Sequence, residues 1–150
     1  MLRRYVREEI RVSKIQISAA LEANPQHPEA VRPFDEPVYL HQVKARGRRG
    51  ALDSWPDLPA ALAAWPSDAQ QIRIHFHVPL FWEGTPEIRP TSDTLSPDFW
   101  QAVAAGPCPH LEVETYSFGM MPPAVRPPDV VRSLELELDW VRDRLRAPLT

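Results

Sequence analysis

The alternation of hydrophobic and polar residues predicts three main strands in this chain. Residues 12–18, 72–80 and 110–116 each place apolar side chains at every second position, which is the period of a β-strand with two different faces. A shorter extended stretch covers residues 38–43, and the alanine-rich residues 19–23 resemble a short helical turn. The strands are separated by segments with a helical period.

Apolar residues that recur at intervals of three and four predict the helices. Such segments cover residues 1–10, roughly 57–65, the stretch from Ser96 to Gly106, and 129–146. Ser96, Pro97 and Asp98 form a good helix start, because a capping residue precedes proline and an acid in the first turn. The last helix has the clearest periodicity, with apolar residues at Val130, Leu134, Leu138, Val141 and Leu145.

Helices and strands that follow one another in this order favour an α/β fold with parallel strands and helical crossovers. The chain has 150 residues, which fits one domain over 1–150. A proline-rich insertion covers about 24–56 and contains the basic run 44–49, which is interpreted as a solvated loop. A complete (β/α)₈ barrel needs eight strands and about 250 residues, so three main strands would form only part of one.

Composition narrows the functional classes. The formal net charge is −3, so a nucleic-acid partner is not expected. The chain has one cysteine, Cys108, which fits a reducing cytoplasm. The arginines near the start are not followed by an apolar signal core, and no apolar run of about 18 residues predicts a membrane span.

Paired polar residues on the predicted strands are the main candidates for chemistry. Residues i and i+2 share one face of a strand, so His75 and His77 should point the same way. Glu112 and Glu114 form a second such pair on residues 110–116, and Gln16 and Ser18 form a third pair on residues 12–18. Imidazole nitrogens and carboxylates suit a divalent cation such as Mn²⁺, Mg²⁺ or Zn²⁺, or general acid–base catalysis.

A structural role for these residues stays open at this point, because strand histidines are often core residues and strand glutamates are usually solvated. Two further segments carry candidates. His41 and Gln42 form a polar pair beside Tyr39, where a functional and a loop role are equally expected. Trp82 directly follows the strand 72–80 and could form an apolar wall over a pocket.

Four segments together resemble a known family. They are Ser13–Leu21, Tyr39–Val43, Arg73–Leu80 and His110–Tyr116, in this order along the chain. They are similar to the C-terminal part of the EboE family of sugar-isomerase-like metabolite traffic proteins, which belongs among the xylose isomerase-like (β/α)₈ TIM barrels. The resemblance extends over nearly the whole chain.

The resemblance implies that residues 12–18, 72–80 and 110–116 correspond to about strands 6–8 of such a barrel, with roughly five earlier strands missing. In that superfamily, metal ligands come from the C-terminal ends of strands. This implies His77 and Glu114 as ligands of a divalent cation. His75, Glu112 and His41 are then candidate catalytic residues. The candidate substrate-binding residues are Gln16, Ser18, Gln42 and Trp82.

The function implied is the handling of a sugar-like metabolite, or of a lipid or pigment precursor, by an isomerase- or epimerase-like barrel that is inactive as it stands. Two alternatives stay open: a metal-dependent hydrolase, because His-x-His with strand acids also suits water activation, and a non-catalytic binding remnant of a split or truncated barrel. The expected partners are the metabolite and either the missing N-terminal half or a second copy of the chain.

Overall fold

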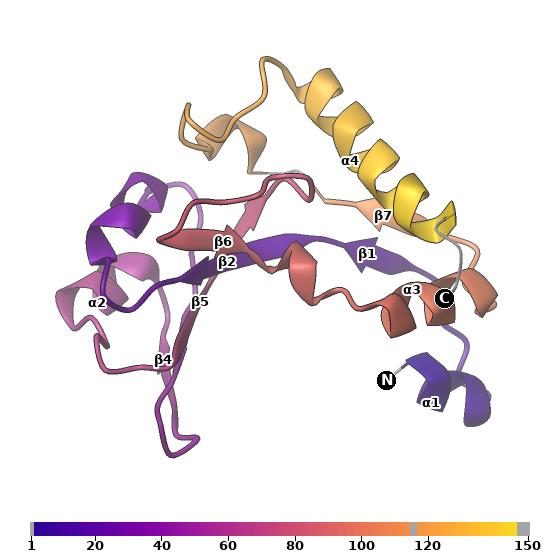
Figure 1. Cartoon of the computed structure of the whole chain (residues 1–150), viewed down its shortest axis with the longest axis horizontal. Coiled ribbons are helices and arrows are strands. Elements are labelled where there is room, and N and C mark those ends of the chain that lie inside the picture. Colours follow the sequence, from indigo (N-terminus) through magenta and orange to yellow (C-terminus); the bar gives the residue numbers. More distant parts are fainter. Residues whose placement is uncertain (1, 115–116, 147–150) are drawn as a thin grey trace.

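The structure is a computed structural model that describes residues 2–114 and 117–146. It is a mixed α/β protein with two open sheets (Figure 1). Its helices and strands are α1 (Leu2–Arg7), β1 (Ile15–Ile17), β2 (Ala19–Ala23), the 3₁₀ helix η1 (Pro28–Phe34), β3 (Val43–Arg46), β4 (Leu52–Trp55), α2 (Leu58–Ala63), β5 (Gln71–Val78), β6 (Ile88–Pro90), η2 (Thr91–Thr94), α3 (Pro97–Ala105), β7 (Leu111–Val113), η3 (Phe118–Met120) and α4 (Val130–Arg146).

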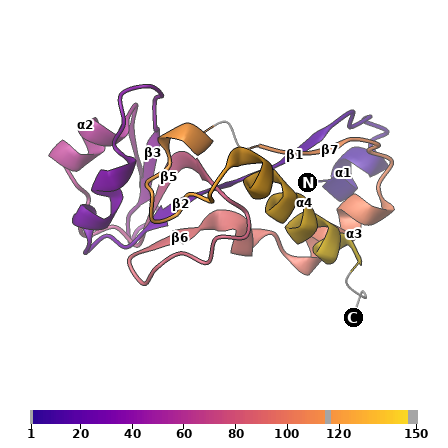
Figure 2. The same ribbon diagram turned by 90° about the horizontal axis from the view of Figure 1, so that it is seen from above.

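The larger sheet has five strands in the order β4-β3-β5-β2-β6, and every neighbouring pair in it is antiparallel. The smaller sheet pairs β1 with β7 in parallel. Figure 1 shows the five-stranded sheet at one end of the molecule, with α1, α3 and α4 gathered around β1 and β7 at the other. Figure 2 shows α4 lying across β1 from above. The described residues close no barrel.

The hydrophobic core lies on one face of the five-stranded sheet. Apolar residues of β2, β3 and β5 alternate with polar ones, and the apolar set packs against η1 and α2. Phe76 of β5 lies edge-on to Phe34 of η1, with ring centroids 5.1 Å apart. The largest fully buried apolar side chains are Phe34, Phe76, Ile17, Leu21, Leu58, Ile72, Ile74, Leu80, Val31 and Val43.

Several predicted elements are confirmed. Helix α3 begins after Ser96, whose hydroxyl accepts the N–H of Phe99, and it ends at Gly106. Helix α4 covers Val130–Arg146 and β5 covers Gln71–Val78, close to the predicted bounds. Among the described residues, no helix has both the length and the apolar content needed to cross a bilayer.

The predicted helical turn at residues 19–23 is wrong, because this segment is strand β2. Ala19, Leu21 and Ala23 are buried, and β2 pairs with β5 on one side and β6 on the other. The backbone N–H and C=O groups of a segment between two strands form hydrogen bonds with both neighbours. This stabilisation outweighs the preference of alanine for helices.

The predicted parallel arrangement holds for β1 and β7 but is wrong for β5, which runs antiparallel to β2. The segment between β2 and β5 supplies no single crossover helix. It contains η1, the hairpin β3–β4 and α2, and it returns the chain in the opposite direction. The basic run 44–49 is therefore not wholly a loop, since Lys44 and Arg46 lie in β3.

The orientation of α4 also differs from its apolar pattern. Val141 is buried, but Val130 and Leu138 are 44% and 48% exposed. Glu137 and Ser133, one and two turns before Val141, are fully buried instead. The carboxylate of Glu137 accepts the backbone N–H of Leu80 at 3.0 Å, and this bond turns the Glu137 side of the helix toward the end of β5.

Candidate functional site

The C-terminal ends of β5 and β7 meet beside Ser18, the residue between β1 and β2. On one side of Ser18, Ile17 is in register with Val113 of β7. On the other side, Ala19 is in register with Val78 of β5. The two strands therefore bring polar residues near their last positions into one region, although they belong to different sheets.

His75 and His77 share one face of β5, as the period of two predicts. Their Nε2 atoms are 2.9 Å apart, which is hydrogen-bond distance, so one ring donates and the other accepts. His77 is 6% exposed, whereas His75 is exposed to solvent. The pair therefore reaches from the protein interior to the surface.

Glu114 approaches the other nitrogen of His77. Its Oε2 lies 3.5 Å from Nδ1 of His77, an ion-pair distance that is longer than a good hydrogen bond. Burial lowers the pKa of His77 below its ordinary value of 6.5. The Glu114 carboxylate raises this pKa, and charge on His75 and His41 lowers it further. The net lowering favours the neutral ring, which can accept a proton or bind a metal.

Glu112 does not join this cluster. It ion-pairs with Lys14 at 3.0 Å, and both side chains are about half exposed. Strand β7 ends at Val113, so Glu114 follows the strand and does not keep the alternation that would align the two glutamates. Gln16 is exposed and in register with Glu112. Ser18 is half-buried between the two sheets.

His41 lies on the opposite, core-facing side of the sheet from His75 and His77. Its ring packs on Phe76, with centroids 4.6 Å apart, and is 1% exposed. Nε2 of His41 is 2.7 Å from Oε1 of Glu36, and Nδ1 is 3.2 Å from the main-chain oxygen of His75. These contacts connect the segment before β3 to β5. Gln42 is exposed, and its carbonyl accepts the N–H of His75 at 2.8 Å.

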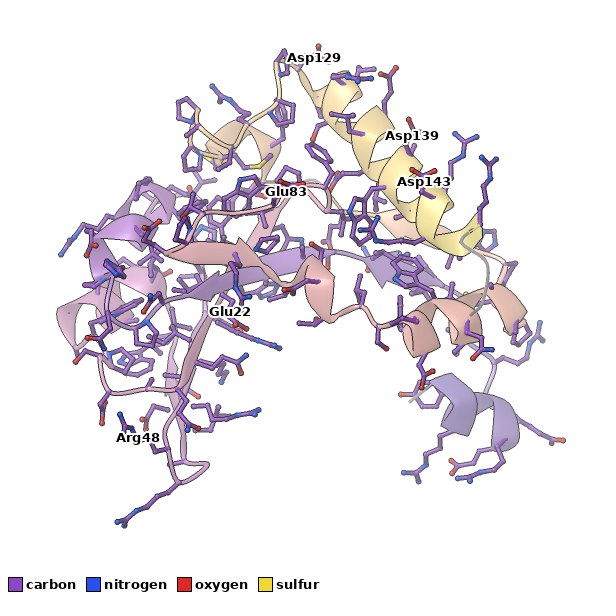
Figure 3. The ribbon with its side chains drawn as sticks, in the orientation of Figure 1. Glu22, Arg48, Glu83, Asp129, Asp139 and Asp143 are labelled. Atoms are coloured by element: carbon purple, nitrogen blue, oxygen red, sulfur yellow. The ribbon has the colours of Figure 1, made fainter. Side chains whose placement is uncertain are left out.

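Trp82 lies in a separate depression after the end of β5. This pocket has a volume of about 410 Å³, and Trp140 and Arg144 of α4 also line it. The Arg144 guanidinium stacks on the Trp140 ring, 3.3 Å from its centroid. Figure 3 marks Glu83, another residue of this pocket, near α4. Charged residues such as Glu83, Arg89 and Asp93 also line this pocket, and the substrate-binding role of Trp82 stays a prediction.

Three residues with structural roles around these sites are missed by sequence reasoning. Glu36 holds His41, Ser117 donates its hydroxyl to the main-chain oxygen of His77, and Glu137 accepts from Leu80. Glu36 and Ser117 lie in irregular segments, where periodicity gives no signal. Glu137 lies one turn before Val141 on α4, but an acidic residue at this position gives no signal of burial.

The contact between His75 and His77 can pass a proton from one ring to the other, because a neutral imidazole both donates and accepts. Glu114 adds a carboxylate at ion-pair distance from His77. The Nε2 atoms of His75 and His77 also lie close enough together to contact one ligand atom. Across residues 2–114 and 117–146, no three His, Cys, Asp or Glu side chains converge as a complete set of metal ligands. Comparison with protein-family models, with curated proteins and with solved structures finds no significant match to this chain.

Proposed function

We propose that this chain binds a small hydroxylated metabolite at His75, His77 and Glu114, as part of a sugar-isomerase-like metabolite traffic protein, and does not turn it over alone. The observation that supports binding is the 2.9 Å contact between the two histidine rings beside the Glu114 carboxylate. The sugar-like substrate class, the relation to strands 6–8 of a xylose isomerase-like barrel and a cytoplasmic location rest on the resemblance and on the composition.

A divalent cation is part of the proposal. The two Nε2 atoms are close enough for both to reach one ion at the usual metal–nitrogen distance of about 2.0–2.1 Å. Glu114 contacts the far nitrogen of His77, the position from which carboxylates commonly orient a metal-bound imidazole. His75 and His77 would hold the ion, and the remaining ligands would come from the metabolite, water or another chain.

Metal titration tests this site. We expect Zn²⁺ or Mn²⁺ to bind the parent chain and His75→Ala or His77→Ala to abolish binding, because each removes one of two protein ligands. Glu114→Gln should weaken binding about 10- to 100-fold, the usual effect of losing an orienting partner. His27→Ala is the matched control, since His27 is a surface residue that contacts Glu29. Isothermal titration calorimetry measures each affinity.

A parent chain that binds none of Mn²⁺, Mg²⁺ and Zn²⁺ would contradict the cation site. An equal loss of affinity in His27→Ala would also contradict it, because the ion would then bind histidines on the surface. Circular dichroism of each variant separates a lost ligand from a lost fold.

The absence of turnover follows from the small number of groups in the cluster. Aldose–ketose interconversion needs a base placed at the substrate carbons and groups that hold the developing enediolate. Barrel enzymes collect these groups from the ends of several strands. Among residues 2–114 and 117–146, the titratable groups of this cluster come from β5 and the residue after β7, and Ser18 stands where a carboxylate would help.

We therefore expect no interconversion across a panel of free and phosphorylated sugars, with or without added Mn²⁺, Mg²⁺ or Zn²⁺. Coupled spectrophotometric assays detect the ketose product. Metal-dependent turnover by the 150-residue chain that is lost in Glu114→Gln would show that this part of the proposal is wrong.

A further inference from the structure

The face of the five-stranded sheet opposite the core is rich in basic side chains. In β3, Val43 and Ala45 are buried, whereas Lys44 and Arg46 alternate with them and are exposed. Arg73 of β5 occupies the open face beside Lys44, because the two residues are in register. The β3–β4 hairpin that carries Lys44 and Arg46 projects from the body of the molecule (Figure 1), and Figure 3 marks Arg48 near its tip.

One row of side chains crosses this open face in register through all five strands: Ser54, Lys44, Arg73, Glu22 and Arg89. Glu22 contacts Arg73 at 3.3 Å and Arg89 at 3.0 Å, so it offsets charge at the β5–β2–β6 side of the row. Burial alone would raise the pKa of Glu22, but hydrogen bonds from Gln71, Arg89 and Arg73 lower it.

The β4 side of the row is different. Nζ of Lys44 is 2.8 Å from Oγ of Ser54, so the ammonium lies over β4, next to the outer edge of the sheet. Among the residues the structure describes, no carboxylate lies within ion-pair distance of Lys44. Its charge is therefore available to a group that approaches this edge.

The main chain of β4 also presents hydrogen-bonding groups at this edge. The N–H of Gly47 donates to the oxygen of Ala51 at 2.9 Å, which makes these residues a hydrogen-bonded pair of the hairpin. Hydrogen-bonded and non-hydrogen-bonded pairs alternate in an antiparallel ladder. The N–H and C=O groups of Leu52 and Ser54 therefore face away from β3, where no other described strand pairs with them.

We propose that β4 accepts an extended acidic segment of a partner protein as a sixth strand. Its main chain would pair with Leu52 and Ser54, as in other cases of β-strand addition. A carboxylate opposite Ser54 would meet the Lys44 ammonium, and an apolar side chain opposite Leu52 would cover a leucine that is 61% exposed. The expected motif is acid, any residue, apolar.

Two other occupants fit less well. Nucleic acid is disfavoured because the side chains that flank the edge on the open face are Lys44, Arg46, Leu52 and Ser54, which include no aromatic ring to stack on a base. A second copy pairing through its own β4 would bring two basic hairpins together, which like charges oppose. An acidic strand would form main-chain hydrogen bonds with β4 and would also pair with the Lys44 ammonium.

Fluorescence anisotropy with a labelled hexapeptide, Thr-Glu-Thr-Val-Thr-Glu, tests the proposal on the full chain. We expect saturable binding that is absent for the same peptide with both glutamates changed to lysine. Lys44→Glu should weaken binding by at least about tenfold, because it places like charges at a close contact. Arg32→Glu is the matched control, since it makes the same charge change on η1, which packs against the core face.

Ser54→Pro tests the backbone separately from the charge. Proline removes an N–H that faces outward, and edge strands tolerate proline there, so the fold should survive while peptide binding is lost. Hydrogen exchange should show slower exchange of the Leu52 and Ser54 amides when the peptide is bound. The proposal is overturned if no peptide binds, if Arg32→Glu weakens binding as much as Lys44→Glu, if folded Ser54→Pro binds normally, or if duplex DNA binds in place of the peptide.

Discussion

Replacing His41 by alanine is expected to lower the free energy of unfolding by about 3 kcal/mol, because it removes buried polar contacts and leaves a cavity. His41 is 1% exposed, and its ring contacts the Glu36 carboxylate at 2.7 Å and the His75 carbonyl at 3.2 Å. Removal of the ring takes these two contacts away from the Glu36 carboxylate and the His75 carbonyl and opens a cavity beside Phe76. Chemical denaturation followed by circular dichroism measures the change.

The pH dependence of stability follows from the partner carboxylate. Burial alone would raise the pKa of Glu36, but hydrogen bonds from the Val38 N–H, the His41 ring and the Tyr39 N–H lower it below its ordinary value of 4.5. A lowered pKa in the folded state stabilises the protein above the unfolded value. This contribution is lost as the pH falls below 4.5 through the lowered value.

The difference in stability between the parent and Glu36→Gln should therefore be largest near neutral pH and shrink in acid.

His110→Ala is the control for His41→Ala, because His110 is exposed, and it should alter the free energy of unfolding by less than about 0.5 kcal/mol. A His41→Ala variant as stable as His110→Ala would show that the buried contact contributes nothing to stability.

Glu137→Ala is expected to cost about 3 kcal/mol. Glu137 is fully buried in α4, and its carboxylate accepts the N–H of Leu80 at 3.0 Å. Loss of the acceptor leaves the buried Leu80 N–H unsatisfied, which costs about 1–3 kcal/mol, and truncation of a buried side chain adds the cost of a cavity. Glu137→Gln should lose less, because its amide oxygen can still accept from Leu80.

Glu135→Ala provides a control on the same helix with the same change of side chain. Glu135 is exposed and pairs with Arg132 at 3.1 Å, and such surface pairs contribute at most about 1 kcal/mol. Thermal and urea denaturation of the three variants measure the difference. Equal effects of Glu137→Ala and Glu135→Ala would mean that the buried carboxylate does not hold α4 in place.

Elements with a strong local signal were predictable from the sequence. Helix α3 has a serine cap and a glycine stop on either side of its nine residues, and both lie where the pattern indicates. Strand β5 alternates apolar and polar residues over most of its length, and this alternation alone predicts that His75 and His77 share a face. These features depend on neighbouring residues and need no knowledge of the rest of the fold.

Features that depend on distant segments were not predictable. The alanine-rich β2 is a strand because β5 and β6 pair with it, and the direction of β5 is set by a connection that contains a hairpin. The apolar pattern of α4 indicates burial of Leu138, but the hydrogen bond from Leu80 to Glu137 turns that leucine outward. The pattern of apolar residues does not show where a backbone N–H needs a hydrogen-bond acceptor.

The candidate site also combines features that were predictable from the sequence with features that were not. The histidine pair follows from strand periodicity, whereas Glu112 and Glu114 separate because β7 ends between them. The role of His41 could not be predicted, since its partner Glu36 lies in an irregular segment without periodicity. Strand periodicity predicted the face of the sheet on which a side chain lies, but not the residue that it contacts.

The pairing of β1 with β7 also determines the order in which the protein can fold during synthesis. Ile15 is translated before the five-stranded sheet, but its parallel partner Leu111 is translated only after the whole of that sheet. Pairing between such distant residues closes a long loop and forms slowly. The larger sheet can therefore assemble first, and β1 pairs with β7 afterwards. Glu114 follows β7 directly, so the carboxylate reaches His77 only in this last step.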